Sequence, residues 1–147
     1  KYLREAVSEY EKRLSAYCKL KITEVNEYKL PDSPSKAEID HCIEVEGDLM
    51  LSKIPQNAAI VAMCIEGNIL SSEDFSEKLN FIMANESASE LCFVIGGSYG
   101  LSDKIKNKAK LKLSLSRMTF THQISRVLIL EQIYRAFQIS TGGKYHK

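Results

Sequence analysis

The sequence predicts an α/β fold in which one parallel sheet is covered by helices. Short apolar runs typical of buried strands, of which "LCFVI" at 91–95 is the clearest, alternate with segments whose apolar residues recur at helical spacing. Because helices separate the strand-like runs, the strands are expected to pair in parallel through right-handed crossovers. The length of 147 residues favours a single domain, 1–147, with its own core.

The first half of the chain supplies two of the expected helices and two of the strands. Residues 1–17 are expected to form an amphipathic helix, and residues 20–25 alternate as a strand. After the loop "LPDSPSK", Ser35 is expected to cap a helix running to about Lys53, with Glu38 completing a capping box. A turn at 55–57 leads into a strand at 60–65, and a turn at 66–68 is expected to end that strand.

The second half continues the alternation. Ser71 or Ser72 is expected to cap a helix ending at Met83, before the strand at 91–95. A lysine-rich helix at 102–109, a strand at 111–115 and a final helix at 122–139 follow. The apolar residues of the final helix cover so much of its surface that burial on more than one side is expected, and dimerisation is the economical explanation.

The charge is distributed unevenly. The formal net charge of +1 combines +8 from residue 101 onward with −7 before it. A basic third on an acidic remainder suggests a polyanionic partner, although a solvated lysine-rich helix explains the charge equally well. The N-terminus has no apolar signal-peptide core, so a cytoplasmic location is expected.

The cysteines and histidines show no metal-ligand spacing. The four cysteines, Cys18, Cys42, Cys64 and Cys92, form no C-x-x-C pair and are expected to be reduced thiols of the core. The three histidines are equally scattered, so no metal site is expected.

The stretch "FVIGGSYGLS" ends a buried strand in a glycine loop where a ligand can approach the backbone. It lacks the G-x-G-x-x-G pattern of a dinucleotide site and the lysine of a P-loop. In a parallel sheet the ligand lies beyond the carboxyl ends of the strands. Three loops are expected to meet there: the loop after Ile65, the loop at 96–98 and the loop at 115–120.

Several motifs in fixed order resemble one known family. "LSLSRMTFTHQISRVLILEQIYRAF", the terminal "YHK", "VIGGSYGL", "EGNILSSEDF" and the opening "YEKRL" are similar to the ribosomal RNA large-subunit pseudouridine N3-methyltransferases of the SPOUT superfamily. The resemblance covers essentially the whole chain. It implies a trefoil-knotted homodimer that binds S-adenosylmethionine and methylates the N3 nitrogen of a pseudouridine in 23S ribosomal RNA, with the assembled ribosome as the expected substrate.

The resemblance also implies where the cofactor binds. Its contacts would fall on these residues: Met63, Gly96, Gly97, Leu115, Ser116, Arg117, Met118, Thr119 and Phe120. S-adenosylmethionine has no phosphate, so it needs backbone partners and apolar walls around the adenine. The chain departs from the family pattern at Met63, usually leucine, and at Thr121, usually proline, and the family's first strand is missing ahead of Lys1.

Four residues are candidates for the reaction itself: His122, Arg126, Tyr145 and His146. His122 could equally cap or pack the helix that it begins. Arg126 has no acidic partner in its own helix, whereas Arg135 has Glu131, so Arg126 is expected to face RNA.

The glycines at 142 and 143 free a tail that carries Tyr145 and His146, which the resemblance places over the cofactor of the partner subunit. No residue stands out as the general base for the imide proton. A non-catalytic ribosome-binding protein and another adenosine-binding protein remain the alternative functions.

Overall fold

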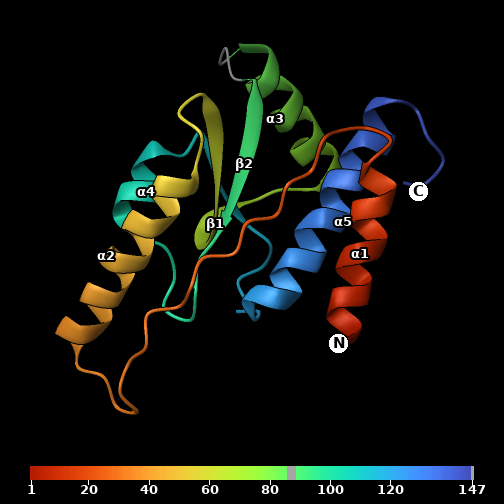
Figure 1. Ribbon diagram of the computed structural model, residues 1–147. Helices are drawn as coiled ribbons and strands as arrows, with labels where there is room; N and C mark the ends of the chain where they lie inside the picture. The colour runs from red at the N-terminus through yellow and green to blue at the C-terminus, as the bar shows by residue number, and fades with distance from the viewer. Residues whose placement is uncertain (86–88, 147) are drawn as a thin grey trace.

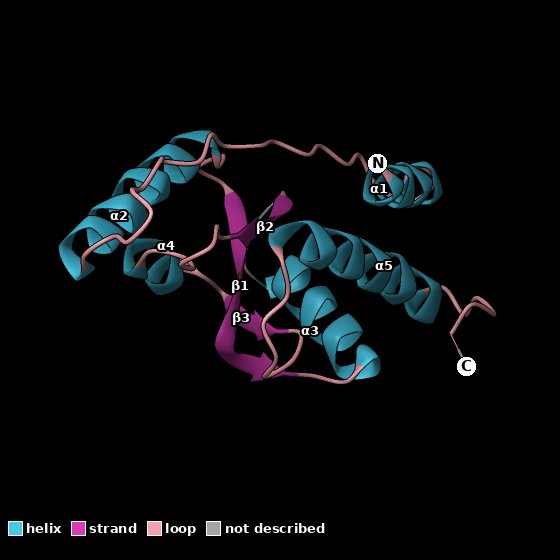
Figure 2. Ribbon diagram, turned by 90° about the horizontal axis from the view of Figure 1, so that it is seen from below, coloured by secondary structure: helices cyan, strands magenta, loops and turns pink. Residues whose placement is uncertain are grey.

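The computed structural model describes residues 1–85 and 89–146 as helices packed on both faces of a three-stranded parallel sheet (Figures 1 and 2). The strands are β1 (Ala58–Ile69), β2 (Glu90–Ile95) and β3 (Leu111–Ser114), in the order β2-β1-β3. The helices are α1 (Tyr2–Leu14), α2 (Lys36–Lys53), α3 (Ser72–Asn85), α4 (Asp103–Lys108) and α5 (His122–Ser140). The predicted α/β class and parallel pairing are confirmed.

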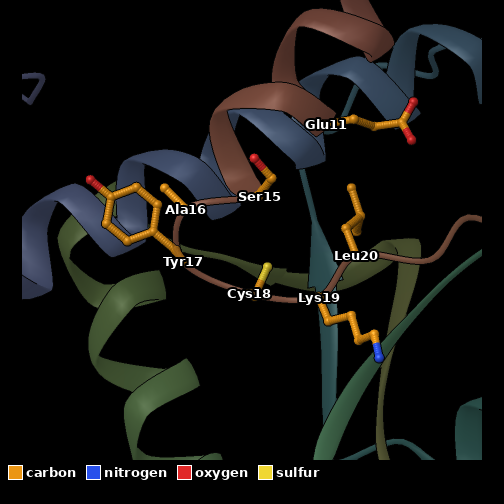
Figure 3. A pocket seen from close by; sticks show the side chains of 7 residues that line it. All are labelled: Glu11, Ser15, Ala16, Tyr17, Cys18, Lys19 and Leu20. Atoms are coloured by element: carbon orange, nitrogen blue, oxygen red, sulfur yellow. The ribbon is translucent and has the colours of Figure 1, made fainter.

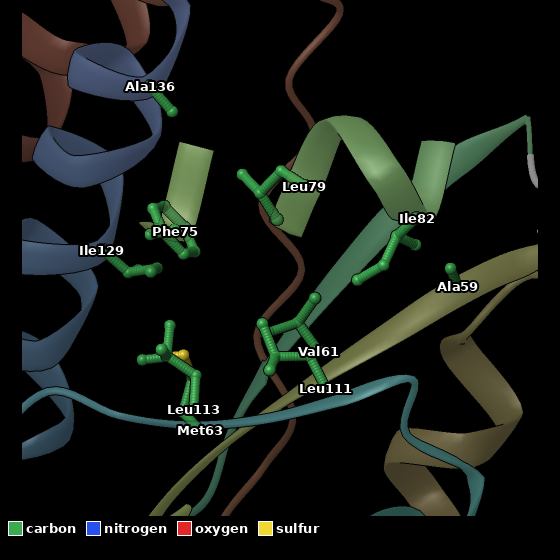
Figure 4. Close-up of a cluster of buried hydrophobic side chains, with 10 residues drawn as sticks. All are labelled: Ala59, Val61, Met63, Phe75, Leu79, Ile82, Leu111, Leu113, Ile129 and Ala136. Carbon is green, nitrogen blue, oxygen red and sulfur yellow. The ribbon is translucent and has the colours of Figure 1, made fainter. Parts of the chain in front are cut away.

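The central strand β1 supplies the core on both faces of the sheet, because successive side chains of a strand point to opposite faces. On one face Val61 and Met63 pack with residues of α3 and α5, including Phe75 and Ile129 (Figure 4). On the other face Ile60 and Ala62 belong to a second cluster with Leu101, Ile105 and Val94. Both clusters are therefore anchored on the same strand.

The layers explain where α5 is buried. Figure 2 shows α2 and α4 on one side of the sheet and α3 and α5 on the other, with α1 lying outside α5. Helix α5 thus packs against α1 and α3 as well as the sheet, which confirms the predicted burial on more than one side. Ile124 and Leu128, near the start of α5, remain 39% and 37% exposed.

Capping residues fix two of the helix starts. In α2 the Glu38 amide donates to Ser35 Oγ at 3.1 Å and the Ser35 amide donates to Glu38 Oε1 at 3.0 Å, so the predicted capping box is confirmed. In α3 the Asp74 amide donates to Ser71 Oγ at 3.0 Å, which identifies Ser71 as the capping side chain.

Two sequence predictions are wrong. Residues 20–25 do not form a strand: Ile22 is half-buried beside α1, so the alternation reflects packing on a helix without a pairing strand. The turn predicted at 66–68 is absent because β1 continues to Ile69. The pairing of β1 with β3 shifts register between Met63 and Asn68, and residues 64–67 form a bulge in the strand.

Candidate active site at the carboxyl edge of the sheet

The register of the sheet brings two of the predicted loops to one edge. Met63 in β1 is paired with Ile95 in β2 on one side and with Leu113 in β3 on the other. The glycine loop follows Ile95 directly, and the loop at 115–120 begins two residues after Leu113. The two loops therefore leave the same edge of the sheet, as predicted, from the strands on either side of β1. The third predicted loop, after Ile65, is instead part of the bulged strand β1.

The glycine loop is a tight turn whose shape requires its glycines. The Gly100 amide donates to the Gly97 carbonyl at 3.1 Å, and Gly100 has a φ of 92°, in the left-handed region. A Cβ at Gly96 would lie 2.7 Å from the Gly100 carbonyl carbon, closer than side-chain carbons approach backbone. Gly96 is therefore needed for the turn itself, whether or not a ligand also contacts it.

A buried carboxylate of α2 lies against this loop. Glu46 in α2 is 9% exposed, and its Oε2 accepts a hydrogen bond from the Tyr28 amide at 3.0 Å. Its Oε1 lies 3.1 Å from the position that a Cβ at Gly97 would occupy. Glu46 does not stand out in the sequence, because α2 carries several acidic residues and only the fold distinguishes the buried one.

The loop at 115–120 presents apolar side chains to solvent. Ser114 Oγ donates to the Ser116 carbonyl at 2.8 Å, and the Met118 amide donates to Ser116 Oγ at 3.0 Å, so side-chain hydrogen bonds define the turn. Met118 is 74% exposed and Phe120 is 37% exposed. Exposed apolar side chains of this size beside a ligand-binding edge are suited to cover a flat apolar group such as a base.

Thr121 fixes the start of α5 through a side-chain hydrogen bond. Its Oγ1 accepts from the Ile124 amide at 3.3 Å, so Thr121 is the N-cap of this helix. The residue that departs from the family's usual proline therefore still fixes where α5 begins.

His122 and Arg126 lie on the first two turns of α5 and face acidic residues of the segment that joins α1 to α2. His122 Nε2 is 4.0 Å from Glu27 Oε1, and Arg126 Nη1 is 2.9 Å from Glu24 Oε1. Arg126 makes no ion pair within α5, as expected from the sequence, but Glu24 pairs with it from another part of the chain. The guanidinium is only partly exposed, whereas Glu24 is freely exposed and can swing away.

The structure does not bring Tyr145 and His146 to this edge within one chain. Both residues follow the C-terminal end of α5, whereas His122 begins it, and a helix of 19 residues is about 28 Å long. Figure 1 shows the last residues beside the end of α1. Tyr145 contacts Glu131 and Tyr10, and His146 contacts Arg135 and Glu73.

Two surface hollows lie along α1 rather than at the sheet edge. One, of about 590 Å³, lies where α1 passes into the following segment and includes Tyr17, Cys18 and Lys19 (Figure 3). The other, of about 370 Å³, has Arg126, Glu24 and Gln123 in its wall together with residues of α1. Neither hollow is lined by the glycine loop or the loop at 115–120.

Ion pairs neutralise much of the basic third of the chain. Lys104 pairs with Glu44 at 3.1 Å and Asp48 at 3.3 Å, and Lys106 pairs with Glu66. Four exposed basic residues from position 101 onward make no ion pair within the described part of the chain: Lys108, Lys112, Arg117 and Lys144. Three of them occur in α4, β3 and the 115–120 loop, and Lys144 follows α5.

The cysteines behave as thiols of the interior. All four are free, and burial is the leading cause of the raised pKa of each thiol. Among residues 1–85 and 89–146, no group of three or more ligating side chains is arranged to hold a metal. No helix in the same residues is long and apolar enough to cross a membrane.

The chain has the architecture of the α/β proteins that bind ligands at the carboxyl ends of a parallel sheet. Comparison with known proteins identifies the family. The family described as "Predicted SPOUT methyltransferase" matches residues 1–146, and the chain belongs to that family.

Curated relatives agree with this assignment. The chain is 50% identical over 147 residues to the ribosomal RNA large subunit methyltransferase H of Clostridium tetani. It is 45% identical over 147 residues to the protein of the same name from Clostridioides difficile. In both comparisons the match covers 100% of this chain and 92% of the relative.

Proposed function

We propose that the protein transfers a methyl group from S-adenosylmethionine to the N3 nitrogen of a pseudouridine in 23S ribosomal RNA. The observation that carries this proposal is that the glycine loop and the 115–120 loop leave the same sheet edge, in a chain of a methyltransferase family whose relatives are named for large-subunit ribosomal RNA. A cytoplasmic location follows from that substrate.

The residues at the sheet edge fit an adenosine that has no phosphate. The glycine loop contains no lysine, and its first turn is closed by its own backbone hydrogen bond from Gly100 to Gly97. The loop at 115–120 offers Met118 and Phe120 as apolar walls. In the helix that follows, Thr121 Oγ1 accepts a hydrogen bond from the Ile124 amide of the first turn. These features support the proposed contacts to Met63, Gly96, Gly97 and the 115–120 loop.

When bound, the cofactor supplies a methyl group already activated by the positive sulfonium. The protein's contribution is then chiefly to align the base with that methyl group and to exclude water. The 115–120 loop is proposed to cover the adenine, and Arg126 to hold a phosphate of the RNA once Glu24 has moved away. His122 stands at the same end of α5, where its imidazole can hydrogen-bond to the substrate.

The site is proposed to be completed by a second copy of the chain. The tail and the sheet edge lie at opposite ends of α5, so a tail can reach a cofactor site only in another molecule. The exposed Ile124 and Leu128, together with Phe120, provide apolar surface for such a homodimer. In this arrangement Tyr145 and His146 contact the flipped-out base in the partner's site.

The decisive experiment is transfer of a tritiated methyl group from S-adenosylmethionine to ribosomes that lack the modification, followed by mapping of the labelled nucleotide. Free RNA and isolated subunits are tested in parallel, with assembled ribosomes expected to be the best substrate. Label on a pseudouridine of the large subunit supports the proposal. Cofactor binding without any transfer would instead favour a non-catalytic ribosome-binding protein.

Calorimetric titration checks the cofactor separately. S-adenosylmethionine and S-adenosylhomocysteine are expected to bind more tightly than ATP, because the glycine loop has no cation for phosphates. Tighter binding of ATP than of both sulfur compounds would point to another adenosine-binding function.

Shared sites can be tested by complementation. A chain lacking residues 144–147 and a Gly96→Trp chain are each expected to be inactive. Mixed dimers of the two contain one site with an intact pocket and an intact tail, so activity should return. Verified mixed dimers that stay inactive would show that each protomer works alone.

A further inference from the structure

The carboxyl-terminal tail, residues 142–146 of the described chain, folds back onto its own helix instead of fraying. Gly142 has a φ of 73°, and the Gly143 amide donates to the Gln138 carbonyl at 2.7 Å, which closes the end of α5. The reversal places the Tyr145 ring 4.8 Å from the ring of Tyr134, edge to face. A terminus without a role is normally free of such contacts.

Glu131 is the centre of the contacts that hold the tail. Its Oε2 accepts hydrogen bonds from Tyr145 Oη at 2.7 Å and from Arg135 Nη2 at 2.7 Å. Its Oε1 accepts from Gln132 Nε2 at 2.9 Å. The side chain is 18% exposed, so these bonds are shielded from water. A carboxylate can accept about four hydrogen bonds, and Glu131 directs its capacity to the tail and to the arginine beside it.

Arg135, which Glu131 holds in place, orients the imidazole of His146. The guanidinium lies 4.7 Å from the centre of the Tyr145 ring, and Nη1 is 3.0 Å from His146 Nδ1. Arginine can only donate, so Nδ1 must accept and the proton of the neutral ring sits on Nε2. That nitrogen lies 3.3 Å from Glu73 Oε2 in α3. The orientation and the tautomer of His146 are thus both set by residues outside the tail.

We infer that Glu131 and Arg135 are positioning residues for methyl transfer, which hold Tyr145 and His146 in the orientation that the reacting base meets. This inference rests on the proposed function, in which the tail completes the partner's site. A network built only for stability would not need to select one nitrogen of an imidazole that lies beyond the end of α5. The network also leaves the cofactor loops untouched, so it should affect the reaction without affecting cofactor affinity.

The test compares Glu131→Gln with the wild-type protein and with Glu77→Gln, a change at an exposed carboxylate in α3 that makes no ion pair among the described residues. Loss of charged hydrogen bonds of this kind should lower kcat for methyl transfer to ribosomes about tenfold or more. The dissociation constant for S-adenosylmethionine should stay within about twofold of the wild-type value, well under the tenfold step of a lost interaction. Glu77→Gln should change neither quantity.

Two further variants separate positioning from folding. Arg135→Lys keeps the charge but loses the planar fork, and it should also lower kcat while the dimer and its melting temperature are retained. Tyr145→Phe removes only the hydroxyl group, and Glu131→Gln added to it should lower kcat by much less than it does alone, because the two groups act as one unit. Multiplying effects in this double variant would indicate an independent structural role for Glu131.

A measurement that does not depend on activity follows the tail directly. Carboxypeptidase should release His146 and Tyr145 faster from Glu131→Gln than from the wild-type and Glu77→Gln proteins. A normal or raised kcat in Glu131→Gln, with its tail released, would overturn the inference. Failure of the wild-type protein to transfer methyl would remove the proposed function as well, so the two failures are distinguishable.

Discussion

The Gly96→Ala substitution is expected to weaken cofactor binding by distorting the glycine loop. The added Cβ would lie 2.7 Å from the Gly100 carbonyl carbon, 2.8 Å from its oxygen and 3.0 Å from the Leu101 amide nitrogen. Ordinary contact begins at 3.4 Å, so the opposing backbone must move by about 0.7 Å. No flexible side chain can absorb the shift, because all three neighbours are main-chain atoms.

The size of the effect follows from the cost of overpacking. Forcing a methyl group against packed atoms costs about 1–3 kcal/mol. If the loop takes up that strain, the dissociation constant for S-adenosylmethionine should rise about 5- to 150-fold, at 1.4 kcal/mol for each factor of ten. The affinity is measured by calorimetric titration, and the melting temperature is recorded alongside it.

Gly142→Ala is the matched control for this prediction. Gly142 has a positive φ, unlike Gly96, but a Cβ there meets nothing within 4 Å, and the residue lies beyond the far end of α5. The control should lower stability by about 1–2 kcal/mol through backbone strain and leave cofactor affinity unchanged. If Gly96→Ala binds S-adenosylmethionine as tightly as the wild-type protein, the proposed role of this loop is wrong.

Three further predictions concern charged residues. Lys112→Ala combined with Arg117→Ala should weaken ribosome binding and make it less salt-dependent. The slope of the logarithm of the binding constant against the logarithm of the salt concentration should fall by about 0.7 for each lost phosphate contact. Lys104→Ala, which removes an ion-paired lysine, is the control, and equal effects of both changes would count against a basic face. Glu46→Gln should destabilise the fold by about 1–3 kcal/mol in urea denaturation and weaken cofactor binding, because a buried carboxylate loses its charge-assisted hydrogen bond. Glu44→Gln, at an exposed position of the same helix, should have little effect. A Glu46→Gln protein with unchanged stability and cofactor affinity would refute the support of the loop by α2. Burial raises the pKa of Glu131, but hydrogen bonds from Arg135 and Tyr145 outweigh it and hold the pKa below its usual 4.5. Its stabilising contribution is therefore complete above that value and lost as the pH falls through the folded pKa, so wild-type and Glu131→Gln proteins should differ in stability at pH 7 and converge in acid.

The sequence was sufficient for the elements with strong local signals. Ser35 and Glu38 mark a helix start through hydrogen bonds within four residues, and the run at 91–95 is too short and too apolar for anything but a buried strand. The extended residues 20–25 and the bulge at 64–67 were not predictable, because both depend on what packs beside them. The 20–25 segment alternates like a strand, but it lies against α1, and only tertiary contacts distinguish the two cases.

In the candidate site, too, local features were predictable from the sequence and long-range contacts were not. Glycines that follow a strand were enough to locate the loop at the sheet edge, and the pairing of Arg135 with Glu131 follows from helical spacing. The pairing of Arg126 with Glu24 spans 102 residues of sequence, and the contact of Glu46 with the loop spans two layers. Contacts at such separations carry no periodic signal, so they can be found only in the folded chain.

The unpaired cations bear on how the protein meets a large target before any contact forms. Because Lys104 and Lys106 are neutralised by neighbouring carboxylates, their charges nearly cancel at a distance. Arg117, in the 115–120 loop, and Lys112, in the strand before it, are exposed and make no ion pair within the described residues, so they keep their positive field. A field of this kind orients two diffusing molecules during their encounter and acts mainly on the association rate. Such orientation would turn the 115–120 loop toward the nucleic acid during the encounter, so that a larger share of collisions leads to binding.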